Sequence, residues 1–503
     1  MNLLFDIANA LLPEMLLAIL IIICLVLTFS FKDDEQNLVF IAAMTGLIFI
    51  LVSFVFLPHF QENSAFSGAF ISNNFTILFR ILILLGATFT VLLSKRYVSN
   101  FGNSIGEFYT LILMATLGAM LLTGANDLIM IFVAIETLSI SSFALCGYTK
   151  LDKFSNEAAL KYLVIGAAST AVMLYGFSFL YGITGQTNVD DIVYALSNYE
   201  GSIALIISFI FVVAGFGYKL SAVPFHTWAP DVYQGAPIPV AAYLSVVSKI
   251  AAFAALIRFM TLIYADISIF TVVIAVISVI TMTAGNLMAV GQKNIKRLLA
   301  YSSIAQAGYV LLGLAVLTTE GISGMIFYLI VYLFMNLGTW AAVQIFASQT
   351  GMDSIDDYNG LAHKNRYFAL CLSVCLLSLA GIPITAGFFA KFYLFKAVLF
   401  AGYEYMPLLI IALVNTVFAV FYYVKVIRAM YVRPVGKFAK QNGEVKISLS
   451  LQTVLVLTVL ATVFLGLFAG PVIDLSKASA DSLRINKKPQ IENSTNITSC
   501  LGQ

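Results

Sequence analysis

Long runs of apolar residues, separated by short polar segments, follow one another along almost the whole chain. A helix needs about 20 such residues to cross the hydrocarbon core of a bilayer. We count about fourteen runs of this kind, and two of them are irregular. The pattern predicts an all-α, polytopic membrane protein whose fourteen spans are centred near residues 22, 47, 84, 117, 136, 170, 211, 252, 279, 306, 335, 384, 418 and 460.

The seventh run is too long for one straight helix and too short for two helices with a loop. It extends from Gly201 to Pro239, and Pro224 follows five residues after Lys219. Proline lacks an N–H group and its ring clashes with the preceding turn, so it breaks a helix. We therefore predict one helix interrupted near Pro224. Broken backbone at membrane depth must be covered by protein or water, which makes the break a candidate functional site.

The twelfth run repeats this irregularity. It extends from Leu370 to Ala401 and contains Gly381, Pro383 and then Lys391. The two predicted breaks lie five spans apart. Because five is odd, two successive five-helix units would cross the membrane in opposite senses, as in inverted-topology repeats. We assign spans 4–8 and 9–13 to the two repeats.

The predicted organisation is a single membrane domain over residues 1–503. Its expected parts are spans 1–3 in about 1–100, the first repeat in 107–265, the second repeat in 267–432, the last span in 449–471 and an outer tail in 472–503.

Composition narrows the function classes. The chain is 61% hydrophobic and 10% charged, whereas soluble domains carry roughly 25% charged residues. This composition indicates a lipid bilayer as partner. The net charge of +2 is uninformative about nucleic acid, and no basic run or aromatic platform supports a nucleic-acid partner. The chain has no C-x-x-C, Walker A or G-x-G-x-x-G motif, and Cys371 and Cys375 have no further soft ligands nearby. We therefore expect no cofactor and no metal in this chain.

Lysine and arginine gather in the connections that follow odd-numbered spans. The positive-inside rule places these connections in the cytoplasm and both termini on the outer, periplasmic side of a bacterial inner membrane. The N-terminal segment lacks the basic start and small-residue cleavage site of a secretory signal, so we expect the first span to remain. The basic residues are Lys32; Lys95 and Arg96; Lys150 and Lys153; Lys293, Lys296 and Arg297; Lys364 and Arg366; and Arg428, Arg433, Lys437, Lys440 and Lys446.

Five ionisable residues fall inside the predicted spans: Glu136, Lys161, Lys219, Lys249 and Lys391. A charge at that depth costs several kcal/mol, so each must be paired, neutral or hydrated. Glu136 is either a protonated structural residue or, as we favour, a partner for Lys219. Lys161 lies about one turn inside the cytoplasmic boundary and could instead snorkel to the interface. Together the five predict a hydrated ion path.

Other polar residues in the spans allow two interpretations. His226, just beyond the first break, could relay a proton or satisfy backbone groups freed by the break. Tyr301 is a further candidate relay in a span that also carries Ser302, Ser303 and Gln306, which could equally serve packing and interhelical hydrogen bonds. For Arg80 and Arg258, which do not release protons readily, we favour structural pairing or snorkelling.

Three segments resemble one known family: KLSAVPFHTWAPDVYQGAPIPVAAYLSVVSK, NIKRLLAYSSIAQAGY and LAGIPITAGFFAKFYLF. The chain is similar, roughly from Glu107 to Tyr431, to the antiporter-like membrane subunits of respiratory complex I, and within them to subunit N of NADH–quinone oxidoreductase. The resemblance implies that Glu136 and Lys219 form the family's glutamate–lysine pair. It implies that Lys249 is the central lysine and Lys391 the outer lysine, and that Lys161 is a further lysine typical of subunit N.

The resemblance also implies a function. We expect a proton-translocating subunit with no redox chemistry of its own, in a complex that couples electron transfer from NADH to quinone with proton pumping. NADH, FMN, iron–sulfur clusters and quinone are then expected in other parts of the complex, and the other membrane-arm subunits are the expected partners. The alternatives are a subunit of a multi-subunit Na⁺/H⁺ antiporter and an assembly subunit that transports nothing.

Overall fold

A computed structural model describes residues 2–30, 37–55, 63–98, 105–197, 203–263, 268–435 and 448–483. The described chain is almost entirely helical. The positive-inside assignments of Lys32, Lys437, Lys440 and Lys446, and the predicted outer tail beyond residue 483, lie outside the described residues.

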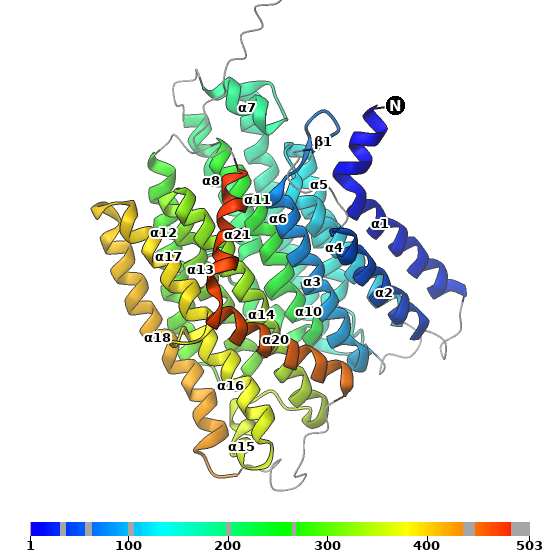
Figure 1. The fold of residues 1–503 in the computed structure, drawn as a ribbon, viewed down its shortest axis with the longest axis vertical. Coiled ribbons are helices and arrows are strands. Elements are labelled where there is room, and N and C mark those ends of the chain that lie inside the picture. Colours follow the sequence, from blue (N-terminus) through cyan, green and yellow to red (C-terminus); the bar gives the residue numbers. More distant parts are fainter. Residues whose placement is uncertain are drawn as a thin grey trace, which may run out of the picture.

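The helices form one bundle, with α1 (Asn2–Ser30) and α2 (Asn37–Ser53) at one edge and α18 (Met406–Tyr431) at the opposite edge (Figure 1). The first half continues with α3 (Asn74–Val98), α4 (Ile105–Gly124), α5 (Leu128–Cys146), α6 (Lys153–Thr184), α8 (Ile203–Leu220), α9 (Trp228–Gly235), α10 (Ile238–Tyr243), the π-helix η3 (Leu244–Ser248) and α11 (Lys249–Ile263). The second half contains α12 (Ser268–Val290), α13 (Ile295–Val316), α14 (Thr319–Thr350), α16 (Arg366–Ala380), α17 (Ala386–Ala401), α18 and α20 (Leu449–Leu467).

The predicted number of spans is confirmed. Twelve helices of the described chain are long and apolar enough to cross a membrane, and α2 and α16 are shorter apolar helices. With α16 and α17 counted as one broken span, these make the fourteen expected. The two breaks fall five spans apart, which is the spacing that inverted repeats require. The residue boundaries assigned to the repeats stay a prediction.

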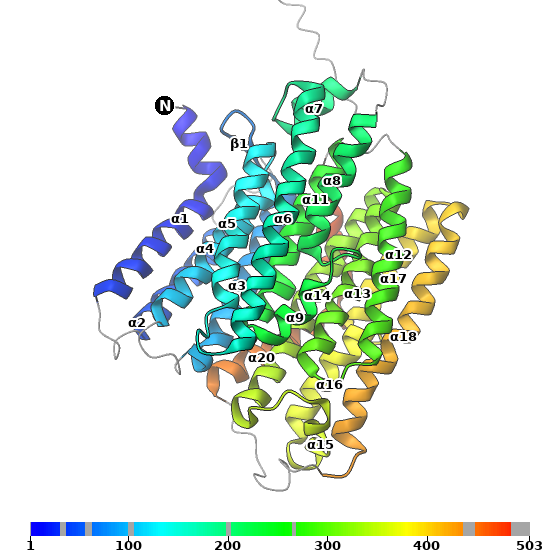
Figure 2. The ribbon, with the colours of Figure 1, turned by 180° about the vertical axis from the view of Figure 1, so that it is seen from behind.

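Several small elements were not predicted; of these, Figure 2 shows the strand 63–65 and the helix 189–196 at one end of the bundle and the helix 361–364 at the other. An antiparallel hairpin pairs Asn63 with Ser72 and Ala65 with Phe70. The segment expected to begin the outer tail forms a helix that packs against α14 and α3. These elements are β1 (Asn63–Ala65), β2 (Phe70–Ser72), α7 (Val189–Leu196), η4 (Ile355–Tyr358), α15 (Leu361–Lys364), η5 (Tyr403–Tyr405) and α21 (Ala469–Asp481).

The central helices are the most buried. The apolar windows of α13 and of residues 238–261 are buried throughout, whereas those of α6, α12, α18 and α20 are less than half buried. Close contact depends on glycine: a Cβ on Gly308 would lie 2.4 Å from Met282 N, and one on Gly285 would lie 2.6 Å from Ala305 N. Small residues let helix backbones approach in this way inside a membrane. Polar groups on the central helices are therefore shielded from lipid.

The first break separates α8 from α9. Ser221 has a φ of 59°, which ends α8, and the indole N–H of Trp228 donates to Tyr218 O at 3.0 Å. The freed Val223 N–H donates to Thr281 Oγ1 of α12 at 3.0 Å. With 18 residues, α8 is itself long enough to count as a span, whereas α9 after the break has only eight residues.

The second break lies near the middle of its span, between helices of 15 and 16 residues. Gly381 has a φ of 84° and caps α16 by donating from its N–H to Leu377 O at 3.0 Å. Gly387 N donates to Ser378 Oγ at 3.0 Å. A Cβ on Gly387 would lie 1.8 Å from Ser378 O, so this close crossing of α16 and α17 requires glycine.

Candidate functional site

The amine of Lys219 is buried beside the first break. Its side chain is 2% exposed, and Nζ donates to Ser139 Oγ of α5 at 3.0 Å and to Tyr162 Oη of α6 at 3.1 Å. Tyr162 stacks on Trp228 with a centroid distance of 4.6 Å, so the aromatic pair of α6 and α9 holds the phenol in place. Both partners of Lys219 are hydroxyls, which can accept or donate a proton.

Glu136 does not form the direct ion pair with Lys219 that we expected. It lies one turn before Ser139 on α5 and is half-buried, and it acts on Lys219 electrostatically. The structure places the serine hydroxyl, rather than the carboxylate, at the amine. Any influence of Glu136 on Lys219 is therefore exerted through space or through intervening groups.

Lys161 belongs to a surface cluster rather than to the buried lysines. Its Nζ lies 2.6 Å from Asp231 Oδ2 and 2.7 Å from Glu157 Oε1, and its side chain is 39% exposed. Asp231 also accepts from Arg297 Nη1 at 2.6 Å, and the same nitrogen donates to Gln234 Oε1 at 3.1 Å. Asp231, which the sequence interpretation missed, thus joins α6, α9 and α13.

Lys249 lies at the centre of the bundle, directly after the π-helix η3. It is 1% exposed, and Nζ donates to Ser303 O at 2.9 Å. Ser303 Oγ accepts from Tyr332 Oη at 2.9 Å. Asn336 Nδ2 donates to Tyr332 Oη at 2.9 Å and to Ser245 Oγ at 3.1 Å. Lys249 is therefore surrounded by a connected set of polar groups from η3, α13 and α14.

Lys391 is buried at the second break, with an exposure of 2%. Nζ donates to Ala380 O at 3.1 Å and to Leu379 O at 3.4 Å, and it lies 4.5 Å from the centroid of the Tyr309 ring. These carbonyls belong to the last turn of α16, where the ladder leaves C=O groups without helical partners. The break itself supplies the acceptors that hold this amine.

A second set of hydrogen bonds leads from Ser302, the residue before Ser303, to the carbonyl that holds Lys391. Ser302 and Tyr423 share a short hydrogen bond between their hydroxyls. Gln306 Nε2 donates to Tyr423 Oη at 3.1 Å and to Leu379 O at 3.0 Å. Because Lys391 donates to the same carbonyl of Leu379, the polar groups of α13 and α18 reach the second break. Beyond it, Asn286 Nδ2 donates to Tyr309 Oη at 3.1 Å.

Tyr162 lies between Lys219 and the segment that precedes Lys249. Its hydroxyl accepts from Lys219 and lies near the side chain of Ser248, the residue before Lys249. The structure therefore buries Lys219, Lys249 and Lys391 among polar groups of neighbouring helices, which we call the buried polar system, and leaves Lys161 at its edge.

Neither candidate relay, Tyr301 or His226, forms a hydrogen bond with Lys219, Lys249 or Lys391 in the described chain. Tyr301 is half-buried and interacts with Arg297, whereas its neighbours Ser302 and Ser303 face the lysines. His226 is half-buried in the first break, and its Nδ1 meets no hydrogen-bond partner in the described chain. Pro224 lies inside the first break and Pro383 inside the second, as predicted.

Arg80 and Arg258 make structural contacts between helices, which is the role that we favoured for them. Arg80 Nε lies 2.7 Å from Glu14 Oε1, and both side chains are buried. Arg258 Nη2 donates to Thr76 Oγ1 at 2.7 Å. These contacts join α1, α3 and α11.

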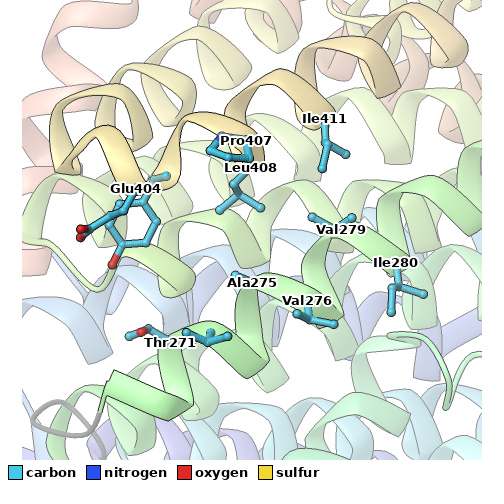
Figure 3. Close-up of a pocket in the computed structure, with 11 residues that line it drawn as sticks. Thr271, Ala275, Val276, Val279, Ile280, Glu404, Pro407, Leu408 and Ile411 are labelled. Atoms are coloured by element: carbon cyan, nitrogen blue, oxygen red, sulfur yellow. The ribbon is translucent and has the colours of Figure 1, made fainter.

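Two cavities of the described chain are lined by residues other than Lys219, Lys249 and Lys391. One of about 640 Å³ lies between α12 and α18, and its side chains are mainly apolar apart from Glu404, Tyr405 and Thr271 (Figure 3). Another, of about 470 Å³, is lined by residues of α14, α17 and α21, including Lys396 and Lys477. Over the described ranges, no group of three or more His, Cys, Asp or Glu side chains could hold a metal ion.

Comparison with known proteins places this arrangement in a family. Residues 125–419 match the family model described as NADH:quinone oxidoreductase/Mrp antiporter, TM. NAD(P)H-quinone oxidoreductase subunit 2 of Synechococcus elongatus is 44% identical over 481 residues, covering 94% of this chain and 92% of the relative. The protein of that name from Acaryochloris marina is 42% identical over 503 residues, covering 97% and 95%.

Solved structures give the same result. A chain of respiratory complex I from Thermus thermophilus, solved with bound aureothin, is 31% identical with a TM-score of 0.77, covering 92% of this chain and 99% of that one. A chain of the Mrp complex from Dietzia sp. is 21% identical with a TM-score of 0.83, covering 95% and 97%, which shows a shared fold. Because the family model spans more than half of its length and its relatives match nearly all of it, this chain belongs to the NADH:quinone oxidoreductase/Mrp antiporter transmembrane family.

Proposed function

We propose that this chain is the proton-translocating membrane subunit of an NAD(P)H–quinone oxidoreductase complex, equivalent to subunit N. The observation that carries the proposal is the burial of Lys219, Lys249 and Lys391 inside the bundle, each hydrogen-bonded and surrounded by hydroxyl and amide groups of neighbouring helices. Lysine suits proton transfer because its charge can be lost on burial, whereas arginine stays charged. The names of the relatives support the quinone-linked complex over a separate Na⁺/H⁺ antiporter.

The setting follows from the same proposal. The chain lies in a bacterial inner membrane with both termini on the periplasmic side, and its partners are the other membrane-arm subunits. It performs no redox chemistry. NADH, FMN, iron–sulfur clusters and quinone bind elsewhere in the complex. Moving one charge across about 100 mV requires roughly 2.3 kcal/mol, which the redox reaction of the partners must supply.

Each lysine has a distinct role in the proposed route. Lys161, paired with Asp231 at the surface, and Lys219 load the proton from the cytoplasmic side, and Glu136 tunes Lys219 through space. Lys249 passes the proton across the centre of the bundle. The hydroxyls of Ser302 and Tyr423 and the amide of Gln306 lead on to Lys391, which delivers it to the outer side.

Substitution of Lys391 by methionine tests the proposal. Methionine has a similar length and no charge, so the complex should assemble while pumping is lost. Quinone reduction and proton uptake would be measured together in vesicles that contain the whole complex. Full pumping by an assembled Lys391→Met complex would overturn the proposed route. Genomic neighbours that encode quinone-reducing subunits rather than antiporter partners would separate the two family functions.

A further inference from the structure

A row of polar side chains on α14 extends beyond the route from Lys219 to Lys391. Tyr332, Asn336, Trp340 and Gln344 are spaced four residues apart, so they follow one another along one side of the helix. The row extends about 18 Å at ~1.5 Å per residue. It begins at the polar groups around Lys249 and approaches the end of α14 that the charge pattern assigns to the cytoplasmic side. We call these four residues the α14 row.

The two halves of the row differ in their contacts. Tyr332 and Asn336 are hydrogen-bonded to Ser303 and Ser245 beside Lys249. Trp340 and Gln344 are equally buried, with exposures of 0% and 1%. Yet Trp340 Nε1 and both amide atoms of Gln344 meet no hydrogen-bond partner in the part of the chain that the structure describes.

Tyr233 of α9 lies against Trp340 of the α14 row. Tyr233 is fully buried, its ring centroid lies 6.2 Å from that of Trp340, and its hydroxyl lies near those of Ser221 and Ser303 without hydrogen-bond geometry to either. Asp231, two residues earlier on α9, has a side chain that is 32% exposed. The polar atoms of α9 and α14 thus continue from the exposed surface cluster towards Lys249.

Buried polar atoms in proteins are nearly always hydrogen-bonded to protein or to ordered water. Leaving one unsatisfied costs about 1–3 kcal/mol, and this place gathers four such atoms. Buried water commonly meets such a need and makes about three hydrogen bonds to polar groups that would otherwise lack partners.

We propose that water bound along the α14 row and Tyr233 connects the Asp231–Arg297 cluster to Lys249. This water gives Lys249 a proton intake of its own, in parallel with the intake through Lys219. The inference rests on the proposed proton-translocating function and adds a second way in. In a parallel arrangement, closing either intake leaves the other working, whereas closing both stops the supply to Lys249.

Pumping by the whole reconstituted complex tests this arrangement. Gln344→Met, which keeps length but removes both polar atoms, should lower pumping in part, and so should Lys219→Ala. The two changes together should remove most of the pumping that either leaves. Gln344→Glu restores a polar side chain and should recover pumping. Thr339→Val is the matched control, because this buried hydroxyl donates to Met335 O within α14, outside the row.

Two outcomes would overturn the inference. One is a Lys219→Ala, Gln344→Met complex that pumps as well as Lys219→Ala alone. The other is a map of the intact complex, at a resolution that shows ordered water, without water at Trp340 Nε1 or Gln344. Because the map needs no variant, it tests the inference even if the double variant fails to assemble. If Lys391→Met abolishes pumping while Gln344→Met leaves pumping unchanged, both in the wild-type complex and in the Lys219→Ala complex, the second intake fails and the proposed function stands.

Discussion

The two helix breaks hold their lysines in different ways. At the first break, Lys219 donates to two hydroxyls, Ser139 Oγ and Tyr162 Oη. At the second, Lys391 donates to two backbone carbonyls of the last turn of α16. A hydroxyl can donate or accept, whereas a carbonyl can only accept. The first setting therefore satisfies either protonation state of a lysine, while the second favours an amine that donates.

Both lysines lie near the C-terminal end of a helix, which carries a partial negative charge that attracts a cation: Lys219 lies in the last turn of α8, and Lys391 donates to a carbonyl of the last turn of α16. The first break divides its span unequally, with 18 residues in α8 before it and eight in α9 after it, whereas the second separates helices of 15 and 16 residues. The comparison teaches that two related breaks surround their amines with different groups: hydroxyls that donate or accept at Lys219, and carbonyls that only accept at Lys391. The following predictions test that difference.

The largest expected effect comes from glycine at the breaks. Gly387→Ala would place a Cβ 1.8 Å from Ser378 O, a backbone atom that cannot move without separating α16 from α17. Overpacking typically costs about 1–3 kcal/mol, and a backbone clash of this severity should prevent stable assembly. Gly217→Ala at the first break would meet the Phe225 ring at 2.8 Å, which can rotate away. Native gels should show loss of the complex only for Gly387→Ala; equal assembly of both would contradict the rigid second break.

The lysines themselves should give the next largest effect. Lys391→Met should abolish pumping, because the outward route has no other buried amine at the second break. Lys219→Met should reduce pumping without abolishing it, because Lys249 has a second intake. Both would be measured as protons moved per quinone reduced in assembled complexes. The ranking would be reversed if the first break were the obligatory route.

The aromatic partners should separate the two settings further. Tyr162→Phe keeps the ring on Trp228 but removes a hydroxyl that accepts from Lys219, a bond worth about 0.5–1.5 kcal/mol. Pumping should slow several-fold. Tyr309→Phe keeps the ring that lies 4.5 Å from Lys391 Nζ, so pumping should stay near the wild-type rate. Initial rates of vesicle acidification would measure both variants. Equal rates for Tyr162→Phe and Tyr309→Phe would contradict the difference between the two breaks.

The smallest effect is expected for Glu136→Gln. Glu136 makes no direct ion pair with Lys219 in the described structure. The substitution therefore removes a nearby negative charge but leaves both hydroxyl partners of Lys219 in place. Pumping should fall less than in Tyr162→Phe when both are assayed in the same vesicles. A stronger loss than in Tyr162→Phe would show that the carboxylate moves into contact with Lys219 during turnover.

Much of this architecture could be predicted from the sequence, because long apolar runs and buried charges are costly and hence informative. Proline and glycine beside lysine located both breaks, at Pro224 and at Pro383. The partners of the lysines could not be predicted in this way. Ser139, Tyr162 and Tyr423 are ordinary residues of apolar helices, and only the packing of distant spans brings them to an amine or to its polar neighbours.

Other differences have equally local causes. The expected pair of Glu136 and Lys219 assumed that opposite charges in one unit must meet, yet the side chain one turn away reaches the amine first. Lys161 was expected along the buried path, but Asp231 holds it at the surface. The π-helix before Lys249 left no recognisable signal in the apolar segment Leu244–Ser248.

Lys249 is the point where both intakes and the outward route meet, so its removal tests the account most directly. The measurement is proton uptake into vesicles that contain the assembled complex with Lys249→Met, at a quinone-reduction rate recorded in the same sample. The account predicts that quinone-linked pumping through this subunit is lost while the complex stays assembled. Pumping at the wild-type ratio of protons to quinone would contradict it.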